Sequence, residues 1–157
     1  MSSPTDRQVI IRIVFSIIGI FVGVSVAIVF AARYQNWNVS IWGLLSGLTA
    51  AATLFVHVCY KKKKWETNPY QLKGYMLAGC FVQLIGVCGF AVYLALAITQ
   101  KQGLKIEGEG YYLTCVWCFM TWKWGFFLFY FSRIYRRLYC DIYTILPNDD
   151  DGKTYTD

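Results

Sequence analysis

Two side chains inside otherwise apolar runs of this sequence are able to do chemistry, His57 and Lys123. An imidazole ligates a transition metal through a ring nitrogen, and an ammonium group binds an anion. Lys123 follows the start of its run, Tyr111, by about 12 residues, which is roughly 18 Å of helix. A charge at that depth in an apolar helix is a functional candidate by default.

The apolar runs contain no Asp or Glu, so Lys123 has no carboxylate partner within them. We therefore expect its counter-ion to be a ligand. Three other interpretations stay open: a deprotonated amine, a cation held by water and carbonyl groups, or a cation over the ring of Trp122 or Trp124. His57 is either a metal ligand or an ordinary buried hydrogen-bonding group.

Motifs typical of enzymes do not accompany these two groups. The sequence has no nucleophile elbow, phosphate-binding loop or paired carboxylates, and one histidine cannot form a histidine cluster for a metal. Cys115 and Cys118 have the spacing of a redox or metal motif, but they lie inside an apolar run, and we expect all six cysteines to be unpaired. The chain is therefore not expected to be an enzyme.

Four long apolar runs must position His57 and Lys123. The chain of 157 residues is 57% hydrophobic and 15% charged, against about 25% charged in soluble domains. About 20 apolar helical residues cross a bilayer, which predicts an all-α membrane protein of one domain with four transmembrane helices. The first run is longer than the apolar part of a signal peptide and is expected to stay as a span. The predicted spans are about 10–32, 39–60, 74–100 and 111–132, followed by a short tail, 133–157.

The distribution of lysine and arginine predicts the orientation of these helices. Four spans place both termini on one side, and that side carries eleven basic residues against three on the other, Arg33, Lys101 and Lys105. Basic residues accumulate on the cytoplasmic side, so both termini are expected in the cytosol. The lysine run 61–64 is then a topology signal, or a contact for lipid headgroups or ligand carboxylates.

Helical periodicity gathers side chains of one kind on single faces. Polar groups need partners in hydrocarbon, so a polar stripe along the second run is expected to face the other helices. Small residues in the first and third runs indicate close packing within the bundle or between protomers. In the fourth run, Lys123 belongs to an aromatic stripe from Tyr112 to Tyr130. The polar stripe consists of Trp42, Ser46, Thr49, Thr53, His57 and Tyr60.

A planar, anionic metal complex suits these groups as a ligand. Haem needs an axial ligand, aromatic walls and cations for its two propionates. The chain has 12 Tyr, 6 Trp, one His and basic residues at the ends of its spans. Composition permits haem without selecting it. The alternatives are a four-span scaffold, or an accessory subunit of a membrane complex such as a proton pump, with no transported substrate.

Parts of the second to fourth runs resemble the haem-responsive gene (HRG) family of four-span haem transporters. The resemblance implies haem import into the cytosol, from outside the cell or from an acidic endosomal or lysosomal lumen. It also implies that His57 is an axial ligand, and that Phe131 to Tyr135 corresponds to a cytosolic Phe-Ala-Arg-Lys-Tyr motif, here without its lysine. The matching residues are His57-Val58-x-Tyr60, Leu94 to Thr99, Tyr111-Tyr112-Leu113, Val116-Trp117, Phe119 and Lys123-Trp124.

From the residues and this resemblance we predict a haem-binding set distributed along the bundle. His57 is the expected axial ligand of the haem iron, and Tyr112 is a second candidate because a phenolate ligates ferric haem. Haem b is the expected transported ligand, with no separate metal or cofactor. The full set is His57, Tyr60, Tyr111, Tyr112, Lys123, Phe131, Arg133 and Tyr135.

Other expected partners are membrane lipids, further copies of the chain in a dimer or trimer, and sorting adaptors, with no nucleic acid. Tyr143 and Leu146 form a tyrosine-based sorting pattern, for which a solvated disordered tail is the alternative. The expected location is the plasma membrane, the endosomal and lysosomal membrane, or both.

Overall fold

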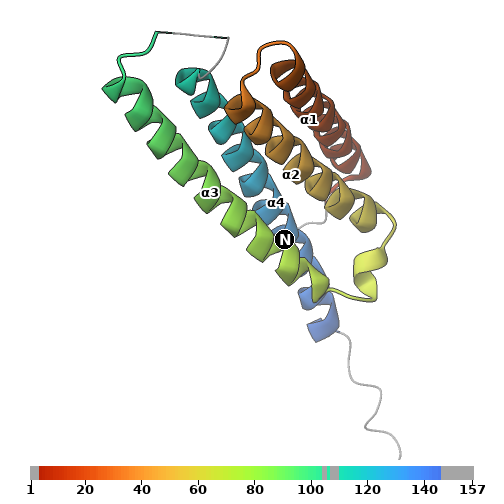
Figure 1. The fold of residues 1–157 in the computed structure, drawn as a ribbon. Helices are drawn as coiled ribbons and strands as arrows, with labels where there is room; N and C mark the ends of the chain where they lie inside the picture. Colours follow the sequence, from red (N-terminus) through yellow and green to blue (C-terminus); the bar gives the residue numbers. More distant parts are fainter. Residues whose placement is uncertain (1–3, 104–105, 107–109, 146–157) are drawn as a thin grey trace, which may run out of the picture.

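The protein is described by a computed structural model that covers residues 4–103, 106 and 110–145, with only the backbone for 140–145 (Figure 1). Within these residues the regular structure is entirely helical, which confirms the all-α prediction. The elements are α1 (Asp6–Ala32), α2 (Trp37–Lys61), a short 3-10 helix η1 (Lys64–Glu66), α3 (Gln71–Thr99) and α4 (Tyr111–Ile145).

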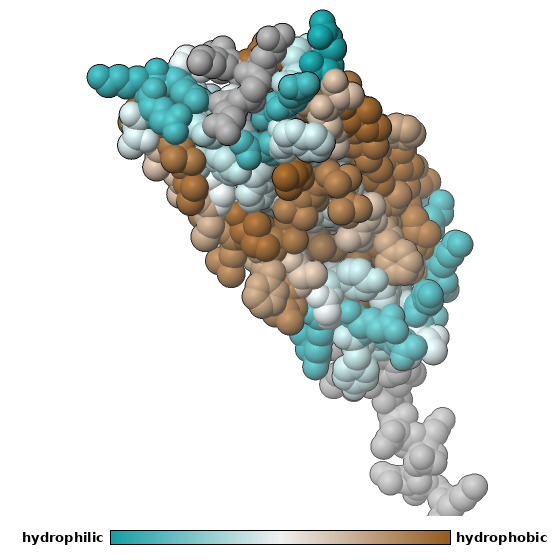
Figure 2. All heavy atoms as spheres, in the orientation of Figure 1, coloured by the Kyte–Doolittle hydropathy of each residue, from teal (hydrophilic) through white to brown (hydrophobic). Residues whose placement is uncertain are grey.

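Three helices are long and apolar enough to cross a membrane, and they coincide with the first three predicted spans. α1, α2 and α3 have 27, 25 and 29 residues, and each contains a strongly apolar stretch of 18 residues. α4 is not among these candidates within the described residues, since aromatic residues and Lys123 replace aliphatic side chains; its crossing stays a prediction. Figure 2 shows an apolar band across the visible face, with hydrophilic residues gathered at both ends.

The helices pack in the order α1, α2, α4, α3, so that α2 and α4 are the inner pair (Figure 1). Glycines bring neighbouring backbones together: a Cβ on Gly23 would lie 2.7 Å from Gly47 Cα, and one on Gly79 would lie 2.7 Å from the backbone nitrogen of Phe129. The small-residue faces predicted for the first and third runs therefore pack within the chain. α1 and α4 are not closely packed along their backbones and meet mainly through long side chains.

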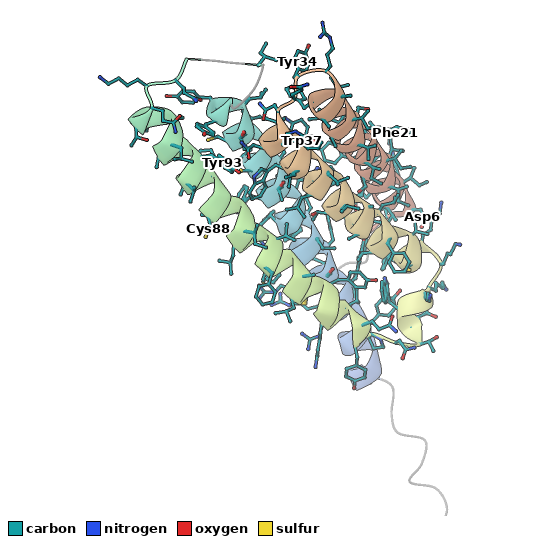
Figure 3. The ribbon with its side chains drawn as sticks, in the orientation of Figure 1. Asp6, Phe21, Tyr34, Trp37, Cys88 and Tyr93 are labelled. Carbon is teal, nitrogen blue, oxygen red and sulfur yellow. The ribbon has the colours of Figure 1, made fainter. Side chains whose placement is uncertain are left out.

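The outer helices present large apolar side chains to their surroundings. Phe21 is 70% exposed on α1, and Cys88 is exposed on α3; the two project away from the bundle on opposite sides (Figure 3). The side chains of the aromatic stripe predicted for the fourth run differ in their exposure. Phe119 and Tyr130 lie on the exposed surface of α4, whereas Lys123 is half-buried.

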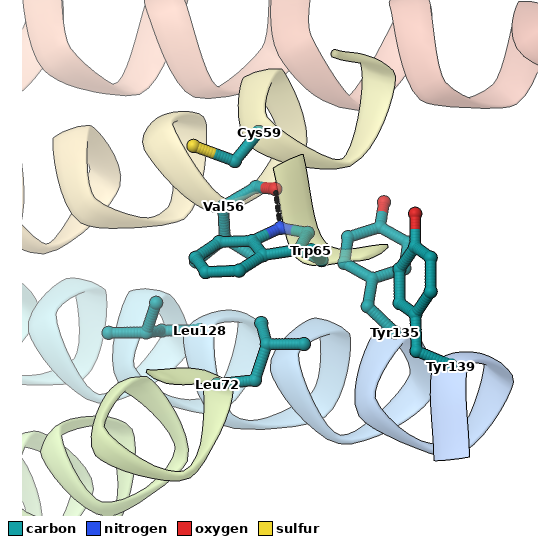
Figure 4. Close-up of a cluster of buried hydrophobic side chains, with 7 residues drawn as sticks. All are labelled: Val56, Cys59, Trp65, Leu72, Leu128, Tyr135 and Tyr139. Carbon is teal, nitrogen blue, oxygen red and sulfur yellow. Dashed lines mark hydrogen bonds between the residues drawn. The ribbon is translucent and has the colours of Figure 1, made fainter. Parts of the chain in front are cut away.

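The connection between α2 and α3 is anchored by a buried tryptophan. The Trp65 indole N–H donates to the carbonyl oxygen of Val56 at 3.1 Å, which satisfies the one polar group of the buried indole. Trp65 is 1% exposed. Figure 4 shows it at the centre of a buried cluster, which we call the Trp65 cluster, composed of Val56, Cys59, Trp65, Leu72, Leu128, Tyr135 and Tyr139.

The first part of the predicted tail is helical. α4 continues past Ser132 to Ile145, because Tyr135 and Tyr139 lie one helical turn apart on the same face and both are buried in the Trp65 cluster. Leu146 lies outside the described residues, and the side chain of Tyr143 is not described. The predicted sorting pattern therefore stays a prediction.

Candidate functional site

The polar stripe of α2 faces the bundle, as its periodicity predicts. Ser46, Thr49, Thr53 and His57 are all buried. The two threonines satisfy their hydroxyl groups within the helix: Thr49 donates to the Leu45 carbonyl at 2.7 Å, and Thr53 donates to the Thr49 carbonyl at 2.9 Å. His57 is the member of the stripe that depends on another helix for its hydrogen bond.

His57 is held by two side chains of α4. A hydrogen bond of 2.8 Å joins its Nδ1 to the hydroxyl oxygen of Tyr135. The ring of Phe131 lies edge-on, with 4.7 Å between ring centroids. The second ring nitrogen, Nε2, is buried and has no hydrogen-bond partner among the described residues. Buried polar atoms without partners are rare and unfavourable, so Nε2 is a candidate ligand atom.

The tyrosines around His57 stay protonated at physiological pH. Burial raises the pKa of the Tyr135 phenol, although a hydrogen bond from Arg12 and its positive charge partly oppose this shift. Burial also raises the pKa of Tyr139 to about 12, with help from Tyr60 and Glu66. The ring of Tyr60 stacks on that of Tyr135 at 4.1 Å between centroids. The hydroxyl group of Tyr135 can either donate to His57 Nδ1 or accept from it. When Nδ1 carries the proton and the phenol oxygen accepts, the lone pair is on Nε2, which is the arrangement typical of metal-ligating histidines.

A cavity of about 210 Å³ lies beside His57, between α1, α2 and α4. Its surface is apolar, and a cavity of this size admits part of a planar ring, since pockets for drug-sized ligands span about 300–1,000 Å³. α1 and α4 must separate further to admit a whole porphyrin. We call it the α1–α4 cavity; its lining residues are Ile11, Arg12, Phe15, Ser16, Thr53, His57, Trp124, Phe127 and Phe131.

Lys123 lies beside the rings that wall this cavity. Its Nζ is 5.2 Å from the centroid of the Trp124 ring and 5.6 Å from that of Phe15. One of the interpretations left open by the sequence, a cation over Trp124, therefore describes its surroundings in this structure. The same position leaves the ammonium group close to any anion that enters between α1 and α4.

Arg12 is a candidate residue of the α1–α4 cavity that the sequence pattern does not predict, because an arginine at the start of a span is typical of a topology signal. Its guanidinium carbon lies 4.6 Å from the centroid of the Phe131 ring. Its Nη1 is buried without a hydrogen-bond partner in the described part of the chain. A signal was present in the sequence: Arg12 precedes Ser16 and Gly23 at helical spacing, on the face of α1 that packs against α2.

The predicted site residues fall into separate groups. His57, Tyr60, Phe131 and Tyr135 are brought together by the contacts described above. Arg133 is exposed and lies over Phe129, with 6.0 Å from its guanidinium carbon to the ring centroid, so it does not line the α1–α4 cavity.

The tyrosine pair lies at the far end of α4. Tyr111 packs against Tyr93 at 6.0 Å between ring centroids, and Tyr112 is half-buried. Tyr112 precedes Tyr135 by 23 positions, or about 35 Å of helix. These tyrosines and the His57 group therefore cannot contact one haem at the same time. Lys105, expected near the tyrosines, lies outside the described residues.

The cysteine pair of α4 packs against α3. The Cys115 thiol approaches the carbonyl oxygen of Phe90 at 3.8 Å, and Cys118 Sγ lies close to Gly89. In the described residues, no group of three or more His, Cys, Asp or Glu side chains is arranged to hold a metal ion.

The fold and this site define a helical membrane protein. The family model described as "Haem-transporter, endosomal/lysosomal, haem-responsive gene" matches residues 72–124. Over this segment the chain is similar to the haem-responsive gene (HRG) family of transporters, which is not a family of enzymes.

Curated relatives from Caenorhabditis elegans extend this similarity beyond the matched segment. Heme transporter hrg-1 is 30% identical over 130 residues, covering 79% of this chain and 66% of that protein, slightly less than two thirds. Heme transporter hrg-4 is 25% identical over 80% of this chain and 79% of its own length, and heme transporter hrg-6 is 22% identical over 92% of each. No solved structure matches the chain.

Proposed function

We propose that this protein transports haem into the cytosol, from outside the cell or from an acidic endosomal or lysosomal lumen. The observation that carries the proposal is the unpartnered Nε2 of His57, buried beside a cavity with aromatic walls in a chain similar to the HRG family. Haem iron accepts an imidazole nitrogen as axial ligand, and porphyrin rings pack against aromatic side chains.

The proposed path runs along α4 from the tyrosine pair to His57. Tyr111 and Tyr112, with Lys101 and Lys105, would gather haem at the outer mouth, where a phenolate is the available iron ligand. Lys123 would attract the propionates about halfway along.

At the inner end His57 would ligate the iron, supported by Tyr60, Phe131 and Tyr135, and Arg133 would meet haem only after it leaves the cavity. Imidazole ligates iron only when neutral, which a neutral cytosol favours over an acidic lumen. The direction of transport follows from this difference if the His57 end faces the cytosol.

The assembly and location remain part of the proposal. Four helices leave little room for a private path within one protomer, and large apolar side chains cover the outer faces of α1 and α3, so a dimer or trimer is proposed. The plasma membrane and the endosomal and lysosomal membrane are the proposed locations. A scaffold without substrate is the rival function, and it predicts no dependence of haem uptake on the site residues.

Haem-dependent uptake by cells expressing the full chain tests the function. His57→Ala and Lys123→Ala should each reduce uptake sharply while reaching the membrane in wild-type amounts, measured by surface labelling. Trp37→Ala is a matched control, since Trp37 is 65% exposed at the other end of α2 and should transport normally. Wild-type uptake by both site variants would contradict the assignment.

A further inference from the structure

Arg12 is half-buried and lines the α1–α4 cavity, and its Nη1 atom is buried. Its guanidinium group lies over the ring of Phe131, and Phe131 in turn contacts the His57 ring. The predicted spans contain no Asp or Glu. A buried guanidinium group is normally paired with an anion, because the desolvation penalty of an uncompensated charge is large.

Two unpartnered polar atoms therefore lie on side chains that line the same cavity, Arg12 Nη1 and His57 Nε2. One donates a hydrogen bond and carries positive charge, whereas the other offers a lone pair in the tautomer described above. A ligand that has a Lewis-acid centre and an anionic oxygen in one molecule satisfies both atoms. An iron porphyrin with carboxylate side chains has this combination.

We propose that Arg12 is the carboxylate-binding residue of the α1–α4 cavity and pairs with a propionate of the haem whose iron is ligated by His57. This inference rests on the proposed function and adds the group that recognises the acidic edge of the substrate. Arginine stacks on an aromatic face and donates in the plane of its guanidinium group at the same time. Arg12 therefore keeps its contact with Phe131 while it binds the carboxylate.

The packing of α1 permits such a ligand to enter. Between α1 and α4 the contacts are made by side chains, including Phe15 with Trp124 at 5.4 Å between ring centroids, and not by closely packed backbones. Movement of these side chains would enlarge the α1–α4 cavity without separating the glycine-packed pairs α1–α2 and α3–α4. Arg12 would then lie at the edge of the opening, where a propionate enters last.

The test compares haem with its dimethyl ester, in which both propionates are uncharged. Detergent-purified full-length protein is titrated with each porphyrin, the Soret band is followed, and His57→Ala is subtracted as the measure of non-specific partition. Wild type should bind haem about tenfold more tightly than the ester. Arg12→Gln should lose most of this discrimination and keep only the part that Lys123 supplies, with an unchanged Soret maximum because His57 still ligates the iron. Arg12→Lys should keep more of the discrimination than Arg12→Gln.

Arg7→Gln is the matched control, since Arg7 is exposed on the same helix and should discriminate like wild type. Discrimination in Arg12→Gln that equals that of wild type, or its absence from wild type, would overturn the role of Arg12 and leave haem ligation by His57 in place. If wild type shows no Soret change that depends on His57, the proposed function fails and this inference fails with it. Should Arg12→Gln not fold, Arg12→Lys and the wild-type ester comparison still decide the result.

Discussion

The polar side chains at the two ends of the bundle differ in their hydrogen bonding. At the Tyr111 end, the Tyr93 hydroxyl donates to Asn38 Oδ1 at 3.2 Å, and the rings of Trp42 and Tyr93 meet edge to face at 6.4 Å between centroids. At the His57 end, polar atoms of Arg12, His57 and Ser132 are buried without partners, whereas the only other such atom in the described residues is Asn36 Nδ2.

This difference indicates that the polar groups at the Tyr111 end serve mainly in helix packing, whereas those at the His57 end are available to a ligand. Paired polar groups at the Tyr111 end fix the positions of α2, α3 and α4, and Asn36 Nδ2 is the one buried polar atom at this end that has no partner among the described residues. Unpaired groups at the His57 end lower stability unless something else pairs with them. The His57 end is therefore expected to change most on binding haem, and mutations there should separate stability from affinity.

The largest expected effect is on stability, from loss of the anchor of the Trp65 cluster. Trp65→Ala removes a side chain that is 1% exposed and should lower the free energy of unfolding by about 3–5 kcal/mol. Denaturant titration in detergent measures this change. Trp37→Ala, at the exposed start of α2, should change the unfolding free energy by less than about 0.5 kcal/mol. Equal losses of unfolding free energy in Trp65→Ala and Trp37→Ala would contradict the expected difference in stability between the two ends.

Tyr135→Phe tests the hydrogen bond that orients the proposed axial ligand. Without the hydroxyl group, His57 Nδ1 loses its partner, and haem affinity should fall about tenfold, as for other groups that support a metal ligand. Spectral titration of purified protein measures the affinity. Tyr93→Phe removes a hydroxyl group of the Tyr111 end and should leave the affinity unchanged; a loss as large as that of Tyr135→Phe would contradict the comparison.

Alkaline pH should destabilise the His57 end through Tyr139. Its pKa is raised from 10 to about 12 because the phenol is buried. Below pH 10 the folded and unfolded states are both protonated and stability is constant; between pH 10 and 12 only the unfolded state loses the proton, so stability falls. Thermal unfolding from pH 8 to 12 should therefore show a steeper decline for wild type than for Tyr139→Phe. Parallel curves would exclude Tyr139 as the cause.

The smallest effect is expected for Arg133, which belongs to the sequence motif but not to the cavity. Arg133→Gln should change haem affinity by less than about twofold, since an exposed charge contributes about 0–1 kcal/mol. Arg12→Gln is the comparison, with its larger expected loss of discrimination. A larger loss of haem affinity in Arg133→Gln than in Arg12→Gln would place the binding site at the predicted cytosolic motif, Phe131 to Tyr135.

Much of the fold follows from patterns in the sequence. Uncharged runs locate three candidate spans, and the spacing of Ser46, Thr49, Thr53 and His57 identifies the face of α2 that is buried in the bundle. Gly23 and Gly79 mark the places where backbones approach closely. These features are local, and a helix displays them along a single stretch of chain.

The parts that escaped prediction depend on pairing between helices. Arg12 has the sequence signature of a topology signal, and only the packing of α1 against α2 and α4 brings it over Phe131. Arg133 is two residues beyond Phe131, and this offset places it on another side of α4. The helical continuation to Ile145 likewise depends on the Trp65 cluster, to which the separate helix η1 contributes Trp65.

The central claim is that His57 ligates haem at its own end of the bundle. A haem titration of detergent-purified wild type, His57→Ala and Tyr112→Phe, followed by the Soret band, tests it most directly. We expect a shifted Soret band in wild type and Tyr112→Phe, and its loss in His57→Ala. A band that persists in His57→Ala and disappears in Tyr112→Phe would place the ligand at the Tyr111 end and contradict the claim.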